Sequence, residues 1–125
     1  MHRINKIFYS VWPATLWSAL ILVLLTLPGS VFPSEGLLGV PHLDKVVHII
    51  LFGFFVYAWT LYFRNNSKEQ RFTILFFVLT ACAYGIIMEY VQRDYIPNRS
   101  FDPGDVVADC AGSLLAGAYL FFSRK

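Results

Sequence analysis

The sequence is poor in charged residues. Lys, Arg, Asp and Glu make up 14% of its 125 residues, whereas hydrophobic residues make up 57%. A soluble domain usually has about a quarter charged residues and at most about half apolar ones. This balance excludes an ordinary soluble domain and predicts a membrane protein. The length predicts a single domain, residues 1–125.

An excess of positive charge is also missing. Ten basic and eight acidic residues give a formal net charge of +2, and the basic residues do not gather on one element. Binding to nucleic acid phosphates requires a basic patch or stripe. Nucleic acid is therefore excluded as a partner, and membrane lipids are the expected surroundings.

Cysteine is nearly absent, since only Cys82 and Cys110 occur. Cys82 is expected near the middle of one apolar segment and Cys110 near the end of the next. These different depths disfavour a disulfide. Buried thiols that act as small hydrophobic side chains are the expected state.

Four apolar segments occupy most of the chain, at about residues 8–27, 46–63, 72–91 and 106–122. Each is close to the roughly 20 residues that a transmembrane helix needs. The expected fold is all-α, a polytopic membrane protein with a compact bundle of four transmembrane helices. The last segment also repeats small residues every four positions, which lets helices approach closely in lipid. These residues are Ala108, Gly112 and Ala116, and Ser113 and Gly117.

The first apolar segment has a second interpretation, as a secretory signal, because the basic residues Arg3 and Lys6 precede it. However, no A-x-A-like cleavage site follows, and the run is longer than the roughly 7–15 residues of a signal core. We therefore interpret it as the first helix. The segment after it, residues 28–41, contains three prolines and three glycines and predicts an irregular loop.

The basic residues predict the orientation, because they favour the cytoplasmic side. Seven lie on the side of the two termini: Arg3, Lys6, Arg64, Lys68, Arg71, Arg124 and Lys125. Three lie on the other side: Lys45, Arg93 and Arg99. Both termini are therefore expected in the cytoplasm, in the cytoplasmic (inner) membrane of a bacterium.

Ionisable residues gather near the outer end of the predicted bundle. His48, Glu89 and Asp109 come from three different segments, and each lies roughly one turn inside the outer boundary at about 1.5 Å per residue. A charged group in hydrocarbon costs at least a few kcal/mol, so such groups normally face the bundle interior and mark a functional site. The sequence therefore predicts one outward-facing polar site.

We assign candidate roles by side-chain chemistry. A histidine flanked by carboxylates is suited to act as a general base, and one of two neighbouring carboxylates can stay protonated and act as an acid. The catalytic candidates are His48, Glu89, Asp105 and Asp109. Polar neighbours are the candidates for ligand binding, and Arg99 suits a phosphate or carboxylate. They are Asp44, Lys45, Gln92, Arg99, Ser100 and Asp102.

No cofactor is identified by the sequence, and no metal site is predicted. His48 with Glu89, Asp105 or Asp109 offers suitable ligand types, but the sequence has no H-x-x-x-H or E-x-x-H pair to mark them.

Each candidate also has a structural interpretation. The run Asp102-Pro103-Gly104-Asp105 is typical of a helix start, with a capping residue, a proline at the first position and an acid at the third. Asp44 also suits a helix N-terminus. His48, Glu89 and Asp109 would then form a polar network that ties the helices together.

Three spaced motifs resemble the VanZ-like family of bacterial membrane proteins. They are Leu43-Asp44-Lys45-Val46-Val47-His48 with Phe52-Gly53; Tyr84-Gly85-x-x-x-Glu89-x-x-Gln92; and Arg99-Ser100-Phe101-Asp102-x-x-Asp105-x-x-Ala108-Asp109-x-x-Gly112. The resemblance covers nearly the whole chain from about residue 40. Family members often have asparagine at the position of Asp109, so the resemblance does not imply that this position ionises.

The resemblance implies a role in the cell envelope, because the family takes its name from members associated with teicoplanin resistance. The expected function is to bind or modify an anionic envelope lipid or a glycopeptide-type ligand at the outward-facing site. The alternative is a non-enzymatic accessory or scaffold subunit of envelope machinery, with a structural polar core.

Overall fold

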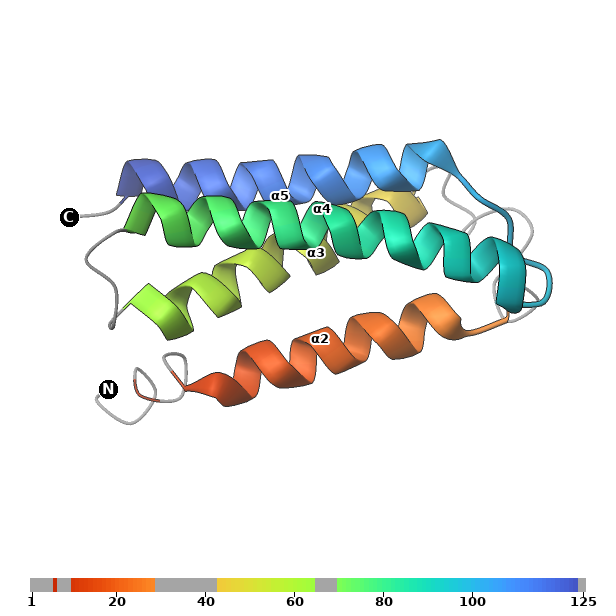
Figure 1. Ribbon diagram of the computed structural model, residues 1–125, viewed down its shortest axis with the longest axis horizontal. Helices are drawn as coiled ribbons and strands as arrows, with labels where there is room; N and C mark the ends of the chain where they lie inside the picture. The colour runs from red at the N-terminus through yellow and green to blue at the C-terminus, as the bar shows by residue number, and fades with distance from the viewer. Residues whose placement is uncertain (1–5, 7–9, 29–42, 65–69, 124–125) are drawn as a thin grey trace.

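The computed structural model describes residues 6, 10–28, 43–64 and 70–123, and every regular element in these ranges is a helix (Figure 1). The helices are α2 (Val11–Thr26), α3 (Leu43–Arg64), α4 (Gln70–Tyr95) and α5 (Pro103–Ser123). The predicted all-α bundle of four helices is confirmed. The predicted loop over residues 28–41 lies almost entirely outside the described residues.

Three of the helices are long and apolar enough to cross a membrane. The qualifying stretches are Asp44–Phe63, Gln70–Tyr95 and Pro103–Ser123. Large apolar side chains on the last two stay exposed on the outside of the bundle, among them Phe72 and Leu115. A contiguous apolar surface of this kind is suited to lipid rather than water. The structure therefore supports a multi-pass membrane protein.

α2 is the shorter apolar helix of the four. Its 16 residues span about 24 Å at 1.5 Å per residue, less than the roughly 30 Å of a hydrocarbon core. It lies within the predicted first span, residues 8–27, of which residues 8 and 9 are outside the described part. The three later spans each extend one to four residues beyond the predicted limits, because polar residues at their ends continue the helix.

Hydrogen bonds hold α2 against the other helices. The Trp17 indole donates to the Leu51 carbonyl of α3 over 2.7 Å, and the Trp59 indole donates to the Ser18 hydroxyl over 2.9 Å. The Tyr84 hydroxyl of α4 donates to the Ser18 carbonyl over 3.2 Å. Because lipid provides no hydrophobic driving force for helix association, helices in a membrane are held together by such hydrogen bonds and by close packing.

α5 packs closely on two sides through glycine. A Cβ on Gly112 would overlap the backbone of Ile49 on α3, and a Cβ on Gly53 would lie 3.1 Å from the Gly112 carbonyl oxygen. On the other side, a Cβ on Gly117 would lie 2.7 Å from Val78 Cγ2 of α4. The small residues of α5 therefore allow the close helix approach that their spacing predicts.

Cys82 of α4 and Cys110 of α5 lie side by side, and their thiols interact. Both cysteines are free and partly exposed. The expectation of different depths is wrong for this pair, because α4 packs against α5 with Gly85, three residues after Cys82, opposite Asp109, the residue before Cys110.

Candidate functional site

α3 and α5 begin, and α4 ends, at the same end of the bundle (Figure 1). Polar side chains gather there. Five of them are buried and three are partly exposed. We call these eight residues the polar layer: Asp44, Lys45 and His48 of α3, Glu89 and Gln92 of α4, and Asp102, Asp105 and Asp109 at and beyond the start of α5. Ten sequence candidates were named, and the structure brings these eight together.

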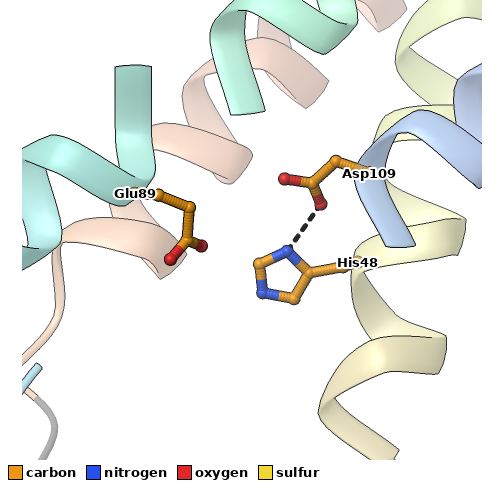
Figure 2. A group of neighbouring side chains, drawn as sticks. All are labelled: His48, Glu89 and Asp109. Carbon is orange, nitrogen blue, oxygen red and sulfur yellow. Dashed lines mark hydrogen bonds and ion pairs between the residues drawn. The ribbon is translucent and has the colours of Figure 1, made fainter. Parts of the chain in front are cut away.

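His48 and Asp109 form the most buried pair of the layer. His48 Nδ1 lies 2.6 Å from Asp109 Oδ1, within hydrogen-bond distance, and Figure 2 shows this contact. His48 Nε2 lies 3.8 Å from Asp105 Oδ2. The imidazole is stacked at 7° to the ring of Phe52, one helical turn further along α3. These contacts fix the plane of the imidazole between two carboxylates.

Asp109 fits against α4 because the residue opposite is a glycine. A Cβ on Gly85 would lie 2.5 Å from Asp109 Oδ2. This oxygen is buried and has no hydrogen-bond partner among the described residues. The role of Gly85 was not assigned from the sequence, although its place four residues before Glu89 puts the two on one face of α4.

Glu89 connects α4 to the segment that precedes α5. Its side chain is 1% exposed, and Oε2 accepts a hydrogen bond of 3.0 Å from the backbone N–H of Asp102. Gln92, one turn later on the same face, donates from Nε2 to the carbonyl of Leu25 in α2 over 2.9 Å. The two side chains therefore join α4 to two different parts of the chain.

Lys45 is surrounded by three carboxylates at the more exposed side of the layer. Nζ pairs with Asp102, with Asp105 at 2.5 Å and with Asp44 at 3.3 Å. The hydrogen bond from Lys45 holds the pKa of the Asp102 carboxyl below its ordinary value. The side chains of Asp44 and Asp102 are 47% and 44% exposed, against 10% for Asp105. Lys45 thus lies between the buried pair and the solvent side.

Asp102 also has the capping role that its sequence context predicts. Its Oδ1 accepts a hydrogen bond of 2.8 Å from the N–H of Gly104, and its carbonyl accepts one of 3.0 Å from the N–H of Asp105. α5 begins at the intervening Pro103. An aspartate at this position satisfies amide groups that the helix leaves without partners. The capping and ligand-binding interpretations of Asp102 are therefore compatible.

Arg99 contacts the end of α2. Its Nε donates to the Leu27 carbonyl over 3.1 Å, and Nη2 donates to the Leu24 carbonyl over 3.3 Å. Burial lowers the pKa of the guanidinium from its ordinary value, while Asp105 and Glu89 act in the opposite direction. The next residue, Ser100, is exposed. Ser100 therefore lies outside the polar layer, whereas Arg99 lies at its edge, near Asp105 and Glu89.

The layer offers two kinds of chemistry. The buried histidine held by an aspartate is a suitable proton acceptor. In addition, His48, Glu89 and Asp109 each offer one ligand atom, and these atoms lie within 4.8 Å of one another. The proton acceptor uses His48 and Asp109, and the metal-ligand group adds Glu89. The three side chains come from three different helices.

The chain matches the family model described as VanZ/LLP1 over residues 1–124. Comparisons with curated proteins and with solved structures give no match. All three motifs that resemble the VanZ-like family lie within the matched range. Because the match extends over nearly the whole chain, the protein belongs to the VanZ/LLP1 family of membrane proteins.

Proposed function

We propose that the polar layer is a binding site for an envelope lipid or a glycopeptide-type ligand at the outer face of the bacterial cytoplasmic membrane. One observation carries the proposal: His48, Glu89, Asp105 and Asp109 are buried close together in a bundle whose interior is mostly apolar. Buried ionisable groups are expensive in a membrane and are usually kept for function. The whole chain, residues 1–125, would act as one domain.

The orientation is part of this proposal. The polar layer faces the outside if both termini are cytoplasmic, as the distribution of basic residues predicts. The exposed turn at Pro97, next to the layer, would then be outside, and the exposed end of α5 at Ser123 would be inside.

Cysteine labelling tests the orientation. In a background without the native cysteines, Pro97→Cys should react with a membrane-impermeant maleimide added to intact spheroplasts, and Ser123→Cys should react only after the membrane is opened. The reverse pattern would put the polar layer at the cytoplasmic face and end the proposal of an extracytoplasmic site.

An anionic ligand would most readily bind at Lys45, by replacing one of the carboxylates that pair with its ammonium. Asp44 and Asp102 are the exposed members of the group around its ammonium, so either can yield to a phosphate or carboxylate of the ligand. Arg99 is less suited to this, because Nε and Nη2 donate to carbonyls of α2. Lys45 would hold the charged end of the ligand, with the His48–Asp109 pair below it as a proton acceptor.

Substitution of Lys45 tests the exchange. Lys45→Gln should weaken binding of a phosphate-headed lipid at least about tenfold in mixed micelles, because an ammonium–phosphate contact contributes on the order of 1.5–3 kcal/mol. Lys45→Arg keeps the charge and should retain most of the affinity. The unmodified protein should bind the phosphate lipid more tightly than the same lipid with a hydroxyl group in place of the phosphate. Equal binding of the two lipids would count against an anionic ligand.

The alternative, an accessory or scaffold subunit, is favoured by a different observation. Gln92 and Arg99 both donate to carbonyls at the end of α2, and Glu89 accepts the N–H of Asp102. These bonds join helices, as a structural polar core would. The substitutions of Glu89 argued in the Discussion separate the two functions.

A further inference from the structure

We infer that His48, Glu89 and Asp109 bind one divalent transition-metal ion between α3, α4 and α5. The ligands would be Nδ1 of His48 and one carboxylate oxygen each from Glu89 and Asp109. Imidazole with carboxylates is a ligand set suited to zinc, manganese or iron(II). This inference goes beyond the proposed function, because an ion can bind here whether or not the layer also holds an envelope ligand.

The three side chains converge from three helices. Figure 2 shows both carboxylates directed toward the imidazole of His48, and the three ligand atoms lie within 4.8 Å of one another. In a tetrahedral zinc site with bonds of about 2.0–2.2 Å, ligand atoms are roughly 3.4 Å apart. The Glu89 side chain, with three rotatable bonds, can close the remaining distance, whereas His48 Nδ1 and Asp109 Oδ1, 2.6 Å apart, are already closer than this and must separate slightly.

A second observation points to the same place. Asp109 is 1% exposed, and its Oδ2 is buried with no hydrogen-bond partner among the described residues. A buried carboxylate oxygen without a partner is costly, and native proteins seldom leave one without a reason. Coordination to a cation would satisfy it. Gly85 leaves the room in which this oxygen lies.

The position of Asp109 selects the ligand nitrogen. Because Asp109 Oδ1 lies 2.6 Å from Nδ1, an ion shared by the two residues must bind on the Nδ1 side of the ring. The ion then takes the place of the proton on Nδ1 and binds the Asp109 carboxylate through the unpartnered Oδ2, and the imidazole proton is carried by Nε2. Nε2 faces Asp105 Oδ2 at 3.8 Å, so Asp105 would accept this proton in a hydrogen bond that tightens slightly. A carboxylate behind a metal-bound histidine is a common arrangement.

The charges also balance. Glu89 and Asp109 are two carboxylates in the interior of a membrane bundle, and a neutral imidazole adds no charge. A dication makes the sum zero, which removes most of the electrostatic cost of burying the acids. The backbone N–H of Asp102 already holds one oxygen of Glu89, which leaves the other for the ion.

The outer acidic group is less suited to a metal ion. Asp44, Asp102 and Asp105 also offer ligand atoms within 4.8 Å of one another. However, the ammonium of Lys45 pairs with all three and already supplies their counter-charge. This group is therefore better placed to draw cations toward the buried site than to hold one.

Metal binding by the full-length chain tests the inference directly. The protein, purified in detergent and stripped with a chelator, should take up one Zn²⁺ or Mn²⁺ per chain and unfold at a higher temperature when loaded. X-ray absorption of the zinc form should show nitrogen and oxygen ligands that include one imidazole. Absence of uptake, or sulfur ligands from the neighbouring thiols of Cys82 and Cys110, would overturn it.

Isosteric substitutions identify the ligands. Glu89→Gln and Asp109→Asn should each lower the metal affinity at least about 100-fold, while Asp105→Asn, behind His48, should lower it about 10–100-fold. Asp94→Asn is the matched control, because it removes one negative charge from an exposed residue of α4 and should leave the affinity unchanged. An equal loss in the control, or no loss in the ligand variants, would contradict the site. If a ligand variant does not fold, uptake and X-ray absorption of the unmodified chain decide.

Discussion

Gly112→Val should prevent the bundle from forming. A Cβ at this position would overlap the backbone carbonyl oxygen of Ile49 and lie 2.8 Å from its Cα, so no side-chain rotation can relieve the clash. Instead α3 and α5 must separate, which weakens their contact along its whole length. Overpacking of a core typically costs about 1–3 kcal/mol, and here the obstacle is backbone, so we expect about 3 kcal/mol or more. Folded, monodisperse protein in detergent should fall to a small fraction of the normal yield.

The matched control lies six residues later on the same helix. Ala118→Val also ends in valine, but Ala118 is exposed on the outside of α5, where two extra methyl groups meet lipid or detergent. Its yield should stay normal. Normal yield of Gly112→Val would mean that α3 and α5 do not pack as the structure has them, and that His48 and Asp109 are not held together by this contact.

The helices could be predicted from the sequence because three of the four apolar segments are long and almost free of charge. The proximity of His48, Glu89 and Asp109 was also predictable, since a helix converts residue number into height at about 1.5 Å per residue and all three lie roughly one turn inside the same boundary. Whether the three form a site stays a prediction. The rule gives their approximate height, but not the register that places Gly85 opposite Asp109.

The partners of Arg99 and Gln92 could not be predicted in this way. Both side chains donate to backbone carbonyls at the end of α2, at Leu24, Leu25 and Leu27. Every residue has a carbonyl, so the acceptors carry no sequence signal. Only the packing of α2 brings these carbonyls within reach, and the sequence pattern gives the length of α2 but not its position.

The axial register of one helix against the next could not be predicted either. The expected separation of Cys82 and Cys110 rested on α4 ending near residue 91, whereas it continues to Tyr95. The four extra residues lengthen α4 by about 6 Å at its end, but the depth of Cys82 is set by how α4 packs on α5, with Gly85 opposite Asp109. Hydropathy marks where the apolar run ends, but α4 continues through the polar residues Gln92 and Arg93.

Glu89 is where the site and scaffold functions give opposite results. Glu89→Gln keeps the size of the side chain and an oxygen that can accept the N–H of Asp102, so the bundle should fold with normal yield. The amide cannot exchange a proton and is a poor metal ligand. If Glu89 acts chemically, a strain that depends on this protein for an envelope phenotype such as teicoplanin resistance should lose the phenotype. Asp94→Asn, the exposed control on α4, should lose nothing.

Glu89→Ala completes the test, because it removes the acceptor as well as the charge. The partly buried N–H of Asp102 loses its acceptor, at about 1–3 kcal/mol for an unsatisfied group, so the folded yield should fall under either function. The decisive comparison is therefore within the Gln variant, between yield and phenotype. A scaffold requires only the hydrogen bond, so normal yield with a normal phenotype would exclude a chemical role for Glu89, and normal yield with a lost phenotype would establish one.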